Sequence, residues 1–275
     1  MTFPIGETLA NGAYRIVEHL RGTGFDALYL GEHQLVSVSI QDDMPIARLR
    51  DEPHQHVDGV FDVAYVGPLD VAGTDPLRDA ECRAAHAFVE QLPEGEPILR
   101  AAPTVAQAVA LGVQTGTILL RAVRAGVVLA GLRPDYIWVR RKPELAIAGI
   151  GGRNHAFFRA ARPRSMVTHP LFTLFYCAPE VFGRGPVDDR ALVFTLATLV
   201  AEWATGTYPF PDCSYGNHRS LDAGQHGILA VPAALESLLH AGLAAEPARR
   251  PSLDEFVSAL AATALLGNDV VEERR

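Results

Sequence analysis

The chain has 275 residues, of which 48% are hydrophobic, so it is long and apolar enough to bury a large core. Its 32 acidic and 24 basic residues give a formal charge of −8, and no long run of Lys or Arg is present. This balance argues against a nucleic-acid partner, because phosphate binding needs a clustered basic surface. Three widely spaced cysteines without a C-x-x-C pair argue against a disulfide scaffold or a zinc ribbon.

The N-terminal residues and the most apolar stretch bear on localisation. The start, MTFPIGETLANG, has neither the basic nor the apolar region of a signal peptide. The most apolar stretch, residues 115–132, is interrupted by Arg121 and Arg124, which favours a buried amphipathic helix over a membrane span. We therefore expect a cytoplasmic protein that does not contact a membrane.

The first third of the chain alternates between apolar and polar residues, as β-strands do. Residues 13–22 and 25–33 flank a glycine-containing turn and predict a hairpin. Three further strands are predicted within residues 34–41, 59–71 and 83–95. A short helix between Pro45 and Pro53 is the one helical insert that we expect, and the whole forms a small antiparallel lobe.

The remainder of the chain is mainly helical in pattern. Residues 104–126 carry apolar residues at helical spacing, and residues 189–206 are apolar nearly all round, as in a central buried helix. Two short strands lie between these helices, at 136–139 and 145–149. Two last helices are predicted within residues 232–243 and 252–266, the second with a Ser252–Glu255 capping box, and residues 268–275 as a frayed tail.

Several motifs in this order resemble those of bacterial Ser/Thr protein kinases. They are YCAPEVF (176–182), TGTYPF (205–210) and EPARRPSLDEF (246–256), with GLRPDYIWV (131–139) matching the catalytic loop. Residues 14–33 resemble the glycine-rich hairpin and residues 87–95 the strand that leads to the hinge. The resemblance implies an α+β, protein kinase-like two-lobed fold. Residues 1–92 would form the small antiparallel β N-lobe and residues 93–275 the larger, mainly helical C-lobe.

The chain departs from the family at every position that handles phosphate or magnesium. Kinase catalysis uses a Lys, a catalytic-loop Asp, an Asn and a second Asp that binds the metal. By the resemblance, these positions hold Gln41, Gly131, Tyr136 and Gly149. Phosphoryl transfer depends almost wholly on positioning and charge stabilisation, so we expect no catalytic residue and no metal site.

The nucleotide pocket that the resemblance implies is altered as well. Two glycine positions of the glycine-rich loop hold Arg21 and Thr23, and the third holds Asp26, which brings negative charge toward any triphosphate. The gatekeeper position holds Glu90, a charge where an adenine pocket prefers apolar walls. We therefore expect neither ATP nor magnesium as a cofactor.

The scaffold positions of the family are kept. Glu180 and Arg250 stand where the family forms a buried ion pair, and this pair is the structural site that we predict. The hypothesis is a pseudokinase, a catalytically inactive kinase-like domain that serves as a protein-interaction or regulatory module for another protein, such as an active kinase or a signalling component. The alternative is a nucleotide- or anion-binding sensor, or a weak non-standard Ser/Thr phosphotransferase, that uses Arg21, Arg133 or Arg153 as anion contacts.

Overall fold

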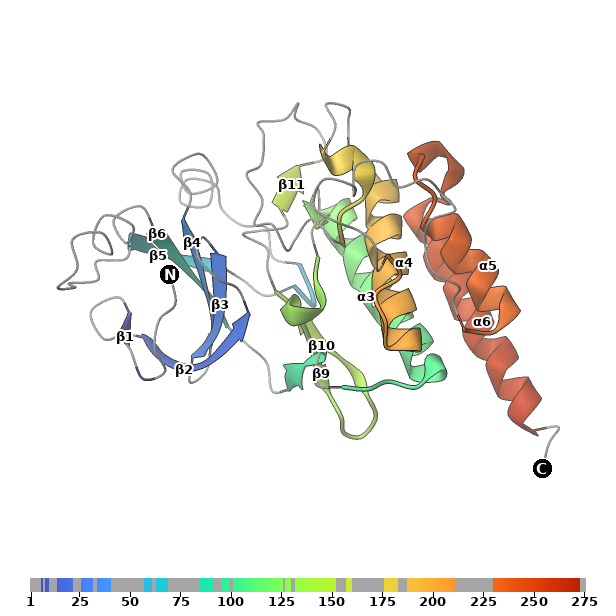
Figure 1. Cartoon of the computed structure of the whole chain (residues 1–275), viewed down its shortest axis with the longest axis horizontal. Helices are drawn as coiled ribbons and strands as arrows, with labels where there is room; N and C mark the ends of the chain where they lie inside the picture. The colour runs from blue at the N-terminus through green and yellow to red at the C-terminus, as the bar shows by residue number, and fades with distance from the viewer. Residues whose placement is uncertain are drawn as a thin grey trace.

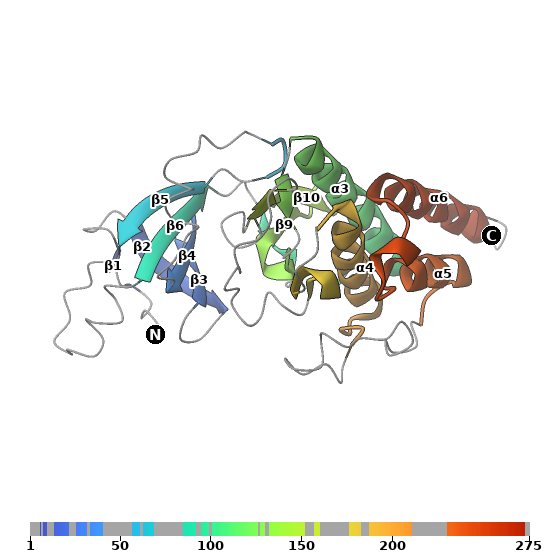
Figure 2. The same cartoon turned by 90° about the horizontal axis from the view of Figure 1, so that it is seen from above.

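The computed structural model has two lobes, a β-sheet of N-terminal strands and a larger helical part (Figure 1). The same division is seen when the molecule is viewed from above, with the N-terminal strands at one end and helices α5 and α6 at the other (Figure 2). The α+β, kinase-like two-lobed class is therefore confirmed. The structure describes residues 6, 8–9, 14–21, 26–31, 34–40, 57–60, 63–68, 85–91, 95–98, 101–125, 127–129, 132–151, 157–159, 176–182, 187–210 and 230–272.

The N-terminal sheet has six strands in the order β1-β2-β3-β4-β6-β5, and every neighbouring pair is antiparallel. The five strands predicted from alternation are present, and the two-residue β1 is added at the edge. The helix predicted between Pro45 and Pro53 lies outside the described residues. The strands are β1 Thr8–Leu9, β2 Tyr14–Arg21, β3 Asp26–Gly31, β4 Gln34–Ile40, β5 Val63–Pro68 and β6 Ala85–Gln91.

Helix α4 (Asp189–Thr205) forms the centre of the helical lobe. All residues from 191 to 201 are buried, which fits a helix whose sequence is apolar nearly all round. The Asp188 side chain caps its N-terminus by accepting from the Arg190 N–H at 3.0 Å, and the helix ends at Gly206, whose φ of +74° suits glycine.

Helix α3 (Val105–Arg124) packs against both α4 and α6 (Leu253–Glu272). Glycine makes the close approach possible: a Cβ on Gly116 would lie 2.3 Å from Cγ2 of Val257 and 3.0 Å from Cδ2 of Leu196. Among the described residues, α3 alone has the length and mean hydropathy, 1.2, of a membrane-spanning helix, and half of that stretch is buried inside the protein. Core helices meet the same criteria.

Helices α5 (Ala233–Gly242) and α6 complete the lobe. The predicted capping box of α6 is present, since the Ser252 N–H donates to Oε2 of Glu255 at 2.8 Å and the Glu255 N–H donates to Oγ of Ser252 at 3.3 Å. The helix runs to Glu272, so the prediction of a frayed tail from residue 268 was wrong. No proline interrupts residues 253–272, and Leu266 and Val270 continue the helical spacing of apolar residues.

Two small sheets lie between the six-stranded sheet and the helices (Figures 1 and 2). One has the order β10-β9-β7, and the other is a pair of β8 and β11. Strand β7 lies just after the predicted lobe boundary at residue 92, and that boundary stays a prediction. Their bounds are β7 Glu96–Pro97, β8 Val127–Leu129, β9 Ile137–Arg140, β10 Ala146–Ile150 and β11 Phe157–Arg159.

Candidate functional site

The segment that resembles a catalytic loop forms a short 3-10 helix, Pro134–Tyr136, between β8 and β9. Pro134 at its first position fixes a backbone angle that the turn needs. The Tyr136 and Arg133 side chains are both buried, at 1% and 2% exposure, and Cζ of Arg133 lies 4.7 Å from the centroid of the Tyr136 ring. We call these two residues, with Gly149, the junction. At the junction the arginine contacts the face of an aromatic ring.

The end of β10 lies directly beside Tyr136. The Gly151 N–H donates to the main-chain oxygen of Tyr136 at 2.7 Å, and Gly149 pairs in register with Trp138 of β9. Gly149, Ile150 and Gly151 are all buried. The two positions that, by the resemblance, correspond to the metal-binding Asn and Asp of kinases are therefore close neighbours. In this chain they hold the buried ring of Tyr136 and Gly149, which has no side chain.

For several predicted site residues, the structure does not describe the side chain. Gln41, Gly131 and Arg153 lie outside the described residues, while Arg21 ends strand β2 and Glu90 lies in β6, where the backbone alone is described. In the described part of the chain, no group of three or more His, Cys, Asp and Glu side chains is arranged to hold a metal ion. The structure thus brings Tyr136 and Gly149 together, and of the three predicted anion contacts it describes the side chain of Arg133.

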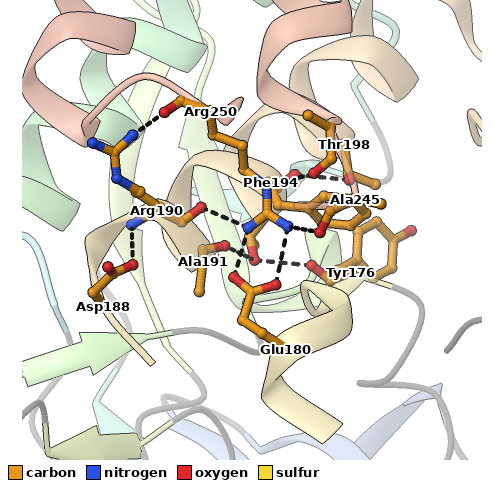
Figure 3. A network of polar contacts seen from close by, with 11 residues as sticks. Tyr176, Glu180, Asp188, Arg190, Ala191, Phe194, Thr198, Ala245 and Arg250 are labelled. Carbon is orange, nitrogen blue, oxygen red and sulfur yellow. Dashed lines mark hydrogen bonds and ion pairs between the residues drawn. The ribbon is translucent and has the colours of Figure 1, made fainter. Parts of the chain in front are cut away.

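Glu180 and Arg250 form a bidentate ion pair in the interior (Figure 3). Nη1 of Arg250 donates to Oε1 of Glu180 at 2.6 Å and Nη2 donates to Oε2 at 2.9 Å. The remaining donors reach main-chain oxygens, from Nε to Ala244 at 2.6 Å, from Nη2 to Ala245 at 2.9 Å and from Nη1 to Arg190 at 3.0 Å. All five N–H groups of the guanidinium are therefore satisfied.

The surroundings of this pair join three elements of the helical lobe. Arg190, in the first turn of α4, donates back to the main-chain oxygen of Arg250, and the Arg250 guanidinium lies 5.1 Å from the centroid of the Phe194 ring. The Leu253 N–H at the start of α6 donates to Oδ2 of Asp189 at 3.0 Å. We call Glu180, Arg190 and Arg250 the charge cluster. It connects the 3-10 helix Pro179–Phe182 with the N-termini of α4 and α6.

Aromatic residues extend the charge cluster along α4. The Tyr176 hydroxyl donates to Oε2 of Glu202 at 2.9 Å, and the Tyr176 ring meets that of Tyr208 edge to face at 5.7 Å. Phe194 and Phe210 stack with ring centroids 5.7 Å apart. The sequence does not predict the Tyr176–Glu202 contact, because the spacing of two residues on separate elements does not reveal that they meet.

The buried thiol of Cys177 is influenced by one charge from the junction, Arg133, and by one from the charge cluster, Glu180. Burial raises the pKa of its thiol from 9.0 to about 12, an effect that the nearby Arg133 opposes and Glu180 adds to. A thiol with so high a pKa is not a nucleophile near neutral pH. Cys177 is a packed core residue.

An open groove of about 410 Å³ lies beside Pro134, at the C-terminal end of α4. Its walls come from the loop before α3, from Pro134 and from the last turn of α4. It is separate from Tyr136 and Gly149, neither of which lines it. The lining residues are Ile98, Ala101, Ala102, Pro103, Pro134, Glu202, Trp203, Ala204, Thr205 and Gly206.

Comparison with known proteins finds Ser/Thr protein kinases, and no protein-family model matches the chain. The chain is 29% identical over 270 residues to Serine/threonine-protein kinase Pkn1 of Myxococcus xanthus, covering 90% of this chain and 38% of that protein. It is 34% identical over 96 residues to Serine/threonine-protein kinase A of Synechocystis sp., covering 32% of this chain and 18% of that protein. Serine/threonine-protein kinase 12 of Arabidopsis thaliana is 26% identical over 165 residues, covering 58% of this chain and 35% of that protein. The chain thus spans between 18% and 38% of the length of these curated relatives.

Proposed function

We propose that this chain, a distant relative of the Ser/Thr protein kinases with a kinase-like fold, is a pseudokinase. It does not transfer phosphate, takes neither ATP nor magnesium as a cofactor, and acts in the cytoplasm as a protein-interaction or regulatory module. Its partner is another protein, such as an active kinase or a signalling component, and neither a nucleic acid nor a membrane.

The junction carries this proposal. Tyr136, at the position of the metal-binding Asn, is 1% exposed, and Arg133 covers its ring. Gly149, at the position of the metal-binding Asp, is buried and has no side chain. Magnesium prefers carboxylate oxygens, phosphate and water as ligands, and neither residue supplies a carboxylate. The positive charge that balances the transferred phosphoryl group is then missing.

The charge cluster supports the second half of the proposal. Every donor of Arg250 is satisfied within the protein, so this buried arginine needs neither a nucleotide nor a metal-bound ligand as its partner. The scaffold that the resemblance implies is therefore kept while the metal-binding positions are changed.

A transfer assay with pure protein tests the proposal. With radiolabelled ATP, magnesium and a general protein substrate such as casein, we expect no label above the heat-inactivated sample. Asp135 is the one carboxylate between residues 126 and 141, so Asp135→Asn serves as the site variant. The partly exposed Glu236 supplies a matched control away from the junction, Glu236→Gln. Magnesium-dependent labelling that Asp135→Asn abolishes and Glu236→Gln leaves unchanged would overturn the proposal.

The relatives favour a second candidate function, Ser/Thr phosphotransfer, because all three are named as Ser/Thr protein kinases. The same assay decides between the two. A sensor that binds an anion through Arg133 is less favoured, since the guanidinium is 2% exposed and would have to leave the Tyr136 ring before a solution anion could reach it.

A further inference from the structure

Trp138 lies in β9, the central strand of the three-stranded sheet β10-β9-β7. Its register partners are Gly149 of β10 on one side and Pro97 of β7 on the other. Residues that pair across neighbouring strands carry their side chains on the same face of the sheet. On that face, the large indole of Trp138 is therefore flanked by a residue without a side chain and by a proline.

The face that carries Trp138 is also the face on which a metal-binding residue would stand. By the resemblance to kinases, position 149 corresponds to the metal-binding Asp, and a carboxylate there would project to the same side as the indole of its register partner. Strand β7, at the other edge, directly follows residues 87–95, which resemble the strand that leads to the hinge. The indole thus lies between the hinge side and the metal side of the nucleotide pocket that the resemblance implies.

This part of the sheet is enclosed. Trp138 is 3% exposed, and Ile137 and Val139, which lie on the opposite face, are 0% exposed. Gly95, just before β7, lies directly on β9, because a Cβ added to it would be 2.6 Å from the main-chain oxygen of Val139. A ligand could therefore reach the face that carries Trp138 only if the indole moved.

Hydrogen bonding does not account for the position of this ring. Nε1 of Trp138 is buried and has no hydrogen-bond partner in the part of the chain that the structure describes. A buried donor without a partner is unfavourable, so the ring is held by packing alone. An indole and a purine are both flat bicyclic rings of similar size, and the volume that Trp138 fills is that of a purine base.

We propose that Trp138 excludes purine nucleotides from this chain, because its indole fills the place of an adenine between Pro97 and Gly149. This role deepens the proposed function and rests on it. Tyr136 and Gly149 remove the side chains that would bind magnesium, and Trp138 removes the space for the base. The two effects differ in one consequence, since loss of the metal ligands alone would still allow adenosine, which carries no phosphate, to bind.

Binding of adenosine to Trp138→Ala is the test, with Trp203→Ala as its matched control. Trp203, the other tryptophan of the chain, is 7% exposed and has a buried Nε1 that is likewise unpaired among the described residues, but it lies in α4. In calorimetric titrations without magnesium, we expect Trp138→Ala to bind adenosine about tenfold or more tightly than the unmodified protein, because an apolar cavity takes up a flat ligand of matching size. Trp203→Ala should gain no binding.

Indole is the second ligand, and it separates a filled pocket from an ordinary core. The cavity left by a tryptophan in any core has the shape of indole, whereas adenosine also needs an opening for its ribose. Indole binding without adenosine binding in Trp138→Ala would place the ring in a closed core and overturn the proposal. Equal gains of adenosine binding in Trp138→Ala and Trp203→Ala, or adenosine binding by the unmodified protein, would overturn it as well.

Trp138→Leu repeats the test if the alanine variant does not fold. Leucine keeps apolar packing beside Pro97 and frees most of the space of the indole, and circular dichroism verifies that the variant is folded. A folded Trp138→Leu protein that binds adenosine no better than the unmodified chain would contradict the proposal. None of these results bears on phosphate transfer, which the labelling assay measures separately, so this role of Trp138 and the proposed function can fail independently.

Discussion

The charge cluster and the junction each bury an arginine against an aromatic ring. Arg250 is 1% exposed, lies over the Phe194 ring and donates to a carboxylate and three main-chain oxygens. Arg133 is 2% exposed and lies over the Tyr136 ring. The first arrangement stands at the two positions where the resemblance to Ser/Thr kinases predicts an ion pair, and the second stands where the same resemblance predicts a metal ligand. The comparison teaches that both segments are packed as parts of the core.

Removal of the Glu180 carboxylate should have the largest effect. In Glu180→Ala the buried Arg250 keeps its charge without a counter-ion, and we expect a loss of about 3–5 kcal/mol in the free energy of unfolding. Urea denaturation followed by circular dichroism measures this loss. Glu236→Gln, which removes the acid of a solvent-accessible pair with His240 at 3.7 Å, should change the stability by less than about 1 kcal/mol. Similar losses in the two variants would mean that the charge cluster does not stabilise the lobe.

Replacement of Tyr136 by the asparagine that the resemblance to kinases implies should be nearly as costly. Tyr136→Asn removes a ring that is 1% exposed and leaves Arg133 without the aromatic face, so we expect a loss of about 3 kcal/mol. Tyr136→Phe keeps the ring under Arg133 and should retain most of the stability. A Tyr136→Asn protein as stable as the unmodified chain would show that the junction is an open loop and not a packed core, and the comparison with the charge cluster would fail.

The sequence predicted the regular elements better than the connections between them. Residues 191–201 are buried on every side because the stretch is apolar all round, and five strands of the N-terminal sheet follow from alternation. Strands such as Glu96–Pro97 and Phe157–Arg159 were missed because two or three residues carry no periodicity, and they exist through partners distant in the chain. Burial of Arg133 was missed for a related reason, since a motif fixes residue types but not which side chain packs on which.

The pKa of the Cys177 thiol is influenced by Arg133 of the junction and Glu180 of the charge cluster, and its ionisation allows a test by pH. Its pKa is raised by burial to about 12, so the folded state keeps the thiol protonated at a pH where an unfolded chain loses the proton. Its contribution to stability is therefore complete below about pH 9 and is lost as the pH rises toward 12, by at most about 1.4 kcal/mol for each pH unit. Compared with Cys177→Ala, the unmodified protein should lose free energy of unfolding between pH 9 and 10. Parallel pH profiles for the two proteins would contradict this.

Two buried threonines allow a comparison of smaller contributions to stability, because the hydroxyl of one is hydrogen-bonded and that of the other is not. Oγ1 of Thr195, beside the charge cluster, donates to the main-chain oxygen of Tyr176 at 2.9 Å, whereas Oγ1 of Thr115 in α3 is buried without a hydrogen-bond partner. We expect Thr195→Val to destabilise the protein by about 1 kcal/mol and Thr115→Val to leave its stability unchanged or raise it. Thermal unfolding of the two variants measures the difference. A reversed order would mean that the polar contacts of the cluster contribute nothing to the stability of the fold.

We expect nucleotide to have the smallest effect of all, because the two positions predicted to bind magnesium hold the buried Tyr136 and Gly149. A ligand present at one hundredfold excess over its dissociation constant stabilises the folded state by about 2.7 kcal/mol. We expect ATP and ADP at millimolar concentration to leave the melting temperature unchanged, with or without magnesium. The Glu180→Ala protein makes a sensitive reference, because a less stable chain melts at a temperature where a small stabilisation by ligand is easily measured. A rise in melting temperature in both proteins would show that a nucleotide binds to the chain. The Arg133→Met variant would then report whether the guanidinium over Tyr136 takes part in binding. Loss of the rise in this variant would place the ligand at the junction, and an unaltered rise would place it elsewhere.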